Sequence, residues 1–107
     1  MATAVPLIDI QELQRRLGTE PEPFLLDVRE PWEYAEAHIA EAHLIPLGQL
    51  ERRVGEIPRD RTVLAICHSG QRSYAAAAYL MQLGYAQVAN VDGGTAAWIQ
   101  SGFPVIR

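Results

Sequence analysis

The sequence has one cysteine, no lysine and no long hydrophobic run, and each scarcity excludes a class of protein. Cys67 is the single cysteine among 107 residues, which excludes an internal disulfide and a cysteine-based structural zinc site. The apolar stretches are only a few residues long, far below the ~20 residues that a membrane-spanning helix needs. Met1 to Pro6 contain neither a basic nor a long apolar stretch, so we expect no signal peptide and a cytoplasmic location.

The charge balance argues against nucleic acid as a partner. All nine basic residues are arginines, and the formal net charge is −4. Proteins that bind nucleic acids gain much of their affinity from basic side chains at the phosphates, and this acidic chain has no basic cluster. Hydrophobic residues make up 49% and charged residues 21% of the chain, which is typical of a globular protein. The length predicts one domain.

Short apolar runs alternate with helical stretches along the chain. Strands are predicted over residues 5–8, 24–28, 43–45, 62–66 and 87–91, and helices over residues 9–17, 31–37, 47–55, 73–83 and 94–102. Strands that alternate with helices form mostly parallel sheets covered on both faces. The sequence therefore predicts an α/β fold of this kind.

Functional residues of such sheets gather beyond the carboxyl ends of the strands. Three groups occupy these positions: Asp27 with Arg29, residues 67–72, and residues 92–94. We expect all three groups to meet at one edge of the sheet. For Asp27 and Arg29 we expect an ion pair that braces the loop at residues 67–73, in preference to a direct part in catalysis.

The segment after the fourth predicted strand carries the chemistry. Cys67 ends a buried strand, a strong helix leaves from about Ser73, and Gly70 lies between them. Such a loop turns backbone N–H groups inward, and the helix N-terminus adds a positive partial charge. A lone cysteine is either a small buried hydrophobe or a reactive thiol. This loop favours the thiolate, with a pKa lowered from ~8.5 to roughly 3.5–7.5, and Arg72 adds a fixed charge and a planar donor fork that suit an anionic substrate.

The ordered series of motifs resembles the rhodanese (sulfurtransferase) family. The resembling segments are residues 26–30, 33–34, 38–39, 42, 45–47, 67–73, 84–85, 91–94, 98 and 102–105. The resemblance implies one rhodanese domain over residues 1–107, with a five-stranded, mostly parallel sheet and helices on both faces. It implies that Cys67 carries a persulfide during catalysis. The loop amides that would cradle this sulfur belong to His68, Ser69, Gly70, Gln71, Arg72 and Ser73.

Loop length separates two chemistries that this fold supports. Cys67 and Arg72 have the spacing C-x4-R, whereas phosphatases of the fold resemble C-x5-R. An added residue widens the cradle for a phosphoryl group, so the shorter loop favours a sulfur atom carried on the thiol. The chain departs from the family at Ala37 and Glu41, where glycine is common. Both departures concern the backbone of a connecting turn and not the chemistry.

Several residues have a structural interpretation that we prefer to a catalytic one. His68 adjoins Cys67, but neighbours on a tight loop usually point apart, so we expect it to shape the mouth of the pocket and not to act as a general base. We expect structural roles for His38 and His43. For Trp32 and Trp98 we expect places in the core or the pocket wall.

The sequence thus predicts an enzyme of the thiosulfate sulfurtransferase (rhodanese) type. It would move a sulfane sulfur from thiosulfate or a persulfide donor to cyanide or a thiol through a persulfide on Cys67. No metal or organic cofactor is implied, and nucleic acid and membranes are not expected partners. One alternative stays open: a rhodanese-like module that relays sulfur to a protein partner, or binds one, with little turnover on small donors.

Overall fold

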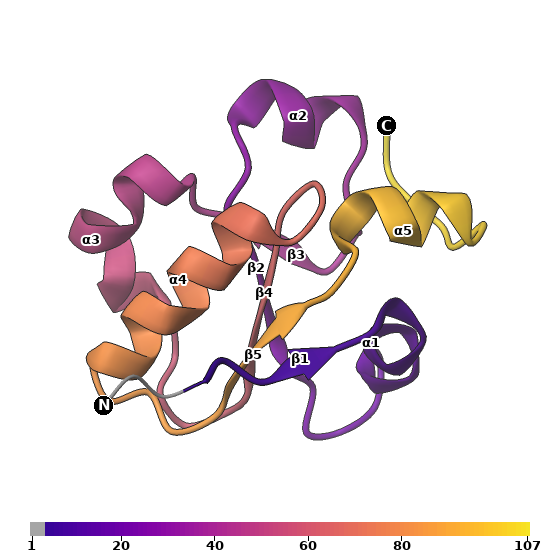
Figure 1. Ribbon diagram of the computed structural model, residues 1–107. Helices are drawn as coiled ribbons and strands as arrows, with labels where there is room; N and C mark the ends of the chain where they lie inside the picture. Colours follow the sequence, from indigo (N-terminus) through magenta and orange to yellow (C-terminus); the bar gives the residue numbers. More distant parts are fainter. Residues whose placement is uncertain (1–3) are drawn as a thin grey trace.

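Five parallel strands form the centre of the computed structural model, which describes residues 4–107 (Figure 1). The strands are β1 (Leu7–Ile8), β2 (Phe24–Asp27), β3 (Ala42–Leu44), β4 (Val63–Ile66) and β5 (Val88–Val91). Their order in the sheet is β1-β5-β4-β2-β3, and every pairing is parallel. The predicted fold class is therefore confirmed. The expectation about a signal peptide rests partly on residues 1–3, which lie outside the described residues.

Helices cover both faces of this sheet. They are α1 (Ile10–Arg16), α2 (Pro31–Glu36), α3 (Leu50–Arg53) between the short 3₁₀ turns η1 (Leu47–Gln49) and η2 (Val54–Glu56), α4 (Gln71–Gln82) and α5 (Gly94–Gln100). In Figure 1, α3 and α4 lie on one side of the sheet and α1 and α5 on the other. Within residues 4–107, every helix is too short or too polar to cross a membrane.

The central strand β4 shows how the two faces are built. Successive side chains of a strand point to opposite faces, so Val63 and Ala65 join the core beneath α3 and α4. Leu64 and Ile66 join the second core, beneath α1 and α5. All four are fully buried, which is why this stretch of sequence is continuously apolar. The same strand delivers Cys67 at its carboxyl end.

The long helix begins earlier than the sequence predicted. The prediction placed its start near residue 73, whereas α4 starts at Gln71 with Gly70 as the N-cap. Gly70 has a φ of 115°, a conformation that favours glycine, and this lets the chain enter the helix directly from a short turn. Arg72 and Ser73 therefore lie in the first helical turn, and the loop itself covers residues 67–70.

Other boundaries differ by one or two residues. The first strand is only Leu7–Ile8 where residues 5–8 were predicted, and β3 is Ala42–Leu44 where residues 43–45 were predicted. Among residues 4–107 only glycines have a positive φ. Ala37 and Glu41 thus stand in backbone that any residue adopts, and the turn needs no glycine at either place.

The first turn of α5, which follows β5, packs directly on the loop after β4. The backbone N–H of Thr95 donates to the carbonyl of Cys67 over 2.9 Å, and that of Ala96 donates to the carbonyl of His68 over 3.0 Å. Gly94 makes this approach possible: a Cβ atom there would lie 2.5 Å from the carbonyl oxygens of Cys67 and His68. Two of the three groups predicted at this edge of the sheet are therefore in contact.

We expect Gly94→Ala to destabilise the fold more than Gly102→Ala. Both glycines have a positive φ, of 61° and 79°, but a Cβ at Gly102 meets open space. The strain of about 1–2 kcal/mol for the left-handed conformation is common to both variants. The clash at Gly94 should add about 1–3 kcal/mol. Chemical denaturation measures both free energies of unfolding, and equal losses would contradict this account.

Candidate active site

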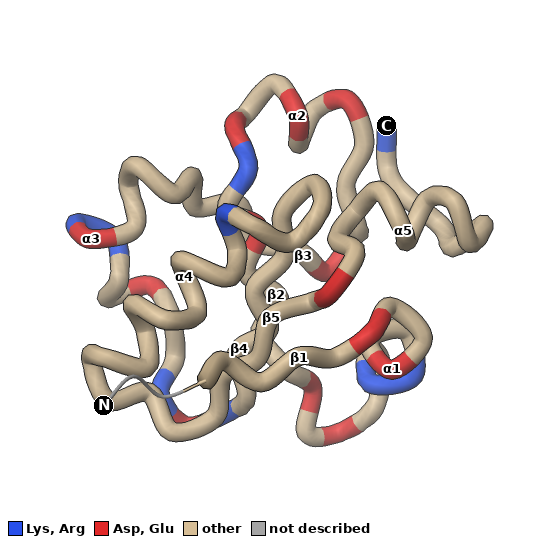
Figure 2. The backbone as a smooth tube through the Cα atoms, viewed as in Figure 1, with Lys and Arg blue, Asp and Glu red and all other residues tan. Residues whose placement is uncertain are grey.

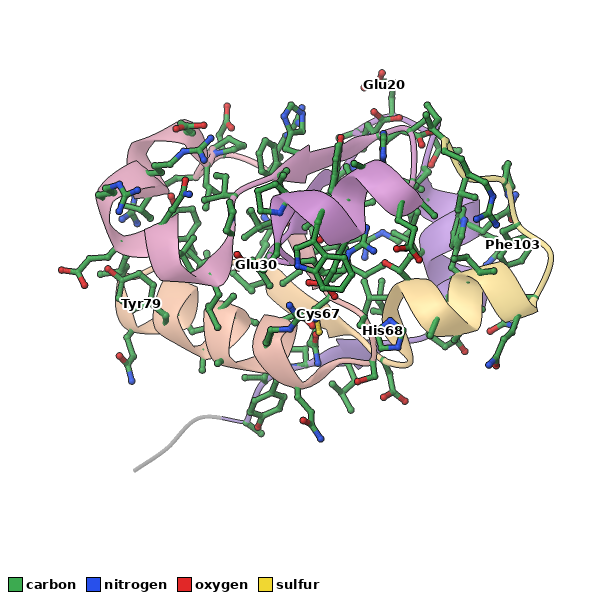
Figure 3. All side chains as sticks on the ribbon, turned by 90° about the horizontal axis from the view of Figure 1, so that it is seen from above. Glu20, Glu30, Cys67, His68, Tyr79 and Phe103 are labelled. Atoms are coloured by element: carbon green, nitrogen blue, oxygen red, sulfur yellow. The ribbon has the colours of Figure 1, made fainter. Side chains whose placement is uncertain are left out.

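Cys67 lies at the base of the turn between β4 and α4. The residue is only 1% exposed. The backbone N–H of Gly70 donates to the sulfur over 3.1 Å, and the Ser73 Oγ atom lies 3.3 Å from it. Figure 3 shows Cys67 beside the first turn of α4, with His68 on the side toward α5. The sulfur is thus recessed and surrounded by hydrogen-bond donors.

These donors lower the pKa of Cys67 below its usual value. Burial raises the pKa, because it disfavours the charged form. Hydrogen bonds from the Ser73 hydroxyl and from the backbone N–H groups of Ser73, Gly70 and Ser69 act in the opposite direction and outweigh burial. The backbone contribution is the one that the loop sequence predicted.

Asn90 belongs to this site, and the sequence reasoning missed it. It lies on β5 and is 3% exposed. Its Nδ2 donates to the carbonyl of Gly70 over 3.0 Å, which turns its Oδ1 toward Ser73, and the Ser73 hydroxyl donates to that oxygen over 2.6 Å. A hydroxyl has one hydrogen, so Asn90 competes with the sulfur for it. The backbone N–H groups therefore support the thiolate more steadily than Ser73 does.

The guanidinium of Arg72 forms an ion pair with Glu33, a contact that the sequence did not predict. Its Nη1 and Nη2 atoms donate to the two carboxylate oxygens of Glu33 on α2, over 2.7 and 2.9 Å. In this structure the donor fork therefore meets Glu33, and its contact with a substrate anion stays a prediction. The identity of a partner 39 positions away along the chain cannot be read from the local sequence. The hydrogen bond from Arg72 lowers the pKa of Glu33 to about 2.

Asp27 and Arg29 form the predicted ion pair, but it braces a different segment. The Arg29 Nη2 atom lies 2.7 Å from Asp27 Oδ2, and both side chains are buried. The remaining Arg29 donors reach the carbonyls of Ala37 and Glu33, over 2.9 and 3.4 Å. The pair therefore anchors α2, the helix that also carries Glu33, the partner of Arg72.

Two hollows flank the loop. The first, of about 350 Å³, lies between α2 and α5 and is lined by His68, Trp32 and Ile99 among others. The second, of about 380 Å³, is lined by Ser69, Gly70 and Gln71, together with residues of β1, α4 and β5. The exposed His68 side chain thus lies at a pocket mouth, as expected.

The other aromatic residues have structural places. Trp98 is buried in the core, and its Nε1 donates to the carbonyl of Pro104 over 2.8 Å. His38 stacks on Tyr34 with ring centroids 3.7 Å apart, and His43 stacks on Phe24 at 4.5 Å. Within residues 4–107 no group of three or more His, Cys, Asp or Glu side chains is arranged to hold a metal ion.

Comparison with known proteins agrees with this geometry. The profile of the rhodanese-like domain family matches residues 9–101. The chain belongs to this family. It is 43% identical over 99 residues to a sulfurtransferase of Allochromatium vinosum, covering 92% of each chain. A rhodanese-related protein of Thermoplasma volcanium is similar in structure, with a TM-score of 0.86, 35% identity and coverage of 94% of this chain and 97% of that one.

A further structural relative is a thiosulfate sulfurtransferase of Pseudomonas aeruginosa. Its TM-score is 0.86 at 26% identity, over 96% of this chain and 20% of the larger one. The rhodanese-like fold and the sulfurtransferase relatives together support a transferase with a role in sulfur transfer.

The pH dependence of Cys67 alkylation tests the site of this rhodanese-like domain. We expect the alkylation rate to reach its plateau below the pH at which an ordinary thiol ionises, because the turn amides stabilise the thiolate. The control is the same protein in denaturant, where the one cysteine is a free thiol with a midpoint near ~8.5. Equal midpoints in the folded and unfolded chains would refute the electrostatic account.

The pair of Glu33 and Arg72 predicts a loss of stability in acid. Glu33 titrates at about 2 in the folded chain against a usual value of 4.5, so its contribution is complete above pH ~4.5 and disappears as the pH falls toward ~2. Glu33→Gln has no carboxylate to protonate at this position, so the free energies of unfolding of the wild type and Glu33→Gln should converge as the pH falls through that interval. Glu51→Gln, on an exposed position of α3, should stay parallel to the wild type. A constant gap between wild type and Glu33→Gln would rule the pair out as the cause.

Proposed function

We propose that this protein is a sulfurtransferase in which Cys67 carries the transferred sulfur as a persulfide. The donor would be thiosulfate or a persulfide, and the acceptor a thiol or cyanide. The observation that supports this most directly is the recessed sulfur of Cys67 with a backbone N–H 3.1 Å away in a glycine turn. The similarity to a thiosulfate sulfurtransferase supports thiosulfate as one donor.

The reaction has two halves. The Cys67 thiolate attacks the outer sulfur of the donor, a new S–S bond forms, and the donor's own bond to that sulfur breaks. Sulfite leaves with the bonding electrons when thiosulfate is the donor. In the second half the acceptor attacks the outer sulfur of the persulfide, and the Cys67 thiolate leaves. This two-step transfer gives ping-pong kinetics.

The burial of Cys67 directs the acceptor to the correct sulfur. Cys67 is only 1% exposed, whereas a sulfur atom added through a disulfide-type bond of about 2 Å would lie nearer the surface. Negative charge on that outer atom is stabilised by the N–H groups of a turn and a helix start. An acceptor therefore meets the outer sulfur and not Sγ, and attack there regenerates the thiolate.

A relay to a protein partner is the second candidate function, and the surface around the loop favours it. Large exposed hydrophobic side chains stand beside both hollows: Trp32 and Ile99 at the first, Leu7 and Tyr74 at the second. Exposed apolar surface of this kind is typical of interaction sites. Fast loading of Cys67 by a protein persulfide, with slow loading by thiosulfate, would favour the relay.

Mass spectrometry of the intact protein tests the proposal. After incubation with thiosulfate, the folded protein should gain one sulfur atom and lose it again on addition of cyanide. Cys67→Ser replaces the thiol by a hydroxyl of similar size, so it should show no added sulfur and no turnover. Added sulfur on Cys67→Ser, or turnover equal to the wild type, would exclude Cys67 as the carrier.

A further inference from the structure

Arg72, the arginine nearest in sequence to the turn, is paired with the carboxylate of Glu33. Both terminal nitrogens of Arg72 face the carboxylate of Glu33, over 2.7 and 2.9 Å. The Glu33 side chain is only 13% exposed and that of Arg72 is 37% exposed. This bidentate geometry is the strong form of an arginine–carboxylate pair. The pair is therefore part of the folded site before any donor arrives.

Glu33 is held in place independently of Arg72. It accepts a hydrogen bond from the backbone N–H of Glu30 over 2.9 Å, as part of the capping box that begins α2. Its own carbonyl accepts from Arg29 over 3.4 Å. The carboxylate is thus fixed by its helix, and Arg72 adapts to it.

The second arginine at this edge of the sheet is also neutralised. Arg29 is buried against Asp27, and Figure 2 shows the other blue segments on α1, α3, the loops at the far end of the sheet and the C-terminus. Two exposed acids remain beside the loop, Glu36 at the first hollow and Asp92 at the second. The side chains around the turn therefore add no net positive charge.

Backbone N–H groups are then left as the main attraction for an anion at the turn. Their partial charges stabilise one negative sulfur, but they do not offset a second full charge as a free arginine would. Thiosulfate brings two negative charges, whereas an alkyl persulfide brings one or none. The carboxylate of Glu33 offsets the charge of Arg72, the nearest full positive charge that could favour the dianion.

We propose that Glu33 is a specificity-determining residue: by pairing with Arg72 it makes the site favour persulfide donors over dianionic thiosulfate. The inference rests on the proposed function and names its preferred substrate class. Glu33 touches neither the donor nor Cys67 in this account, and it acts through the charge of Arg72.

The test compares two donors in Glu33→Gln. Glutamine keeps a side-chain oxygen for Arg72 and for the capping box but removes the charge. The rate constant for loading Cys67, followed by mass spectrometry, is measured with thiosulfate and with an alkyl persulfide whose organic part is uncharged. We expect thiosulfate loading to rise roughly tenfold at low salt, less at high salt, with persulfide loading nearly unchanged.

Two further variants make the result specific. Glu51→Gln removes the same charge from an exposed position of α3 and should leave the donor ratio unchanged. In the double variant Glu33→Gln/Arg72→Gln the gain for thiosulfate should disappear, because no cation is released. A gain that survives in the double variant, or an equal change for both donors, would overturn the inference.

This design separates the inference from the proposed function. If wild-type Cys67 is loaded by neither donor, the proposed function fails, and with it the inference. If Cys67 is loaded but the ratio between donors is the same in wild type and Glu33→Gln, only the inference fails. A denaturation midpoint for each variant shows whether it is folded, and an unfolded Glu33→Gln would itself contradict the claim that glutamine can take the place of Glu33 in the capping box.

Discussion

The turn after β4 directs its backbone N–H groups toward a sulfur atom, while its backbone carbonyls accept hydrogen bonds from other elements. The rest of the site depends on this separation of donors from acceptors. The carbonyls of Cys67 and His68 accept from the first turn of α5, and that of Gly70 accepts from Asn90 on β5. Unpaired carbonyls near a thiolate would repel it and would cost free energy if buried. The neighbouring strand and its helix therefore make the cradle electropositive without any basic side chain.

The sequence predicts the parts of this arrangement that depend on local pattern. The continuous apolar run of β4, followed by Cys67 and then Gly70, indicates a strand that ends in a tight turn. The alternation of strands and helices indicates the parallel sheet, and so the edge where the site lies. These features depend on burial, side-chain periodicity and backbone conformation, which are readable over a few residues.

The partners of Arg72 and Asn90 depend on the assembled sheet and are not readable in this way. Asn90 stands in a strand that is otherwise apolar, and a buried amide requires hydrogen-bond partners. The sequence therefore indicates that Asn90 has polar partners, but it does not identify them as Gly70 and Ser73. Arg72 in the first turn of a helix opposes the helix dipole, which correctly indicates an anionic partner. In this structure that partner is Glu33, which the sequence does not name because α2 lies beside the start of α4 only once the chain has folded.

Two carboxylate–arginine pairs connect the elements around the turn, and their energetic meaning differs. The pair of Asp27 and Arg29 is buried, and Arg29 also donates to backbone carbonyls in α2 and just after it. Losing either partner would therefore leave a buried charge without compensation. The pair of Glu33 and Arg72 is more exposed and contributes less to stability. Its position next to the turn underlies the proposed electrostatic role, in which it offsets a full positive charge where a donor would bind. The backbone dipoles around Cys67, whose direction the fold determines, thus stabilise its thiolate, while the charged side chains of Glu33 and Arg72 join α2 to α4.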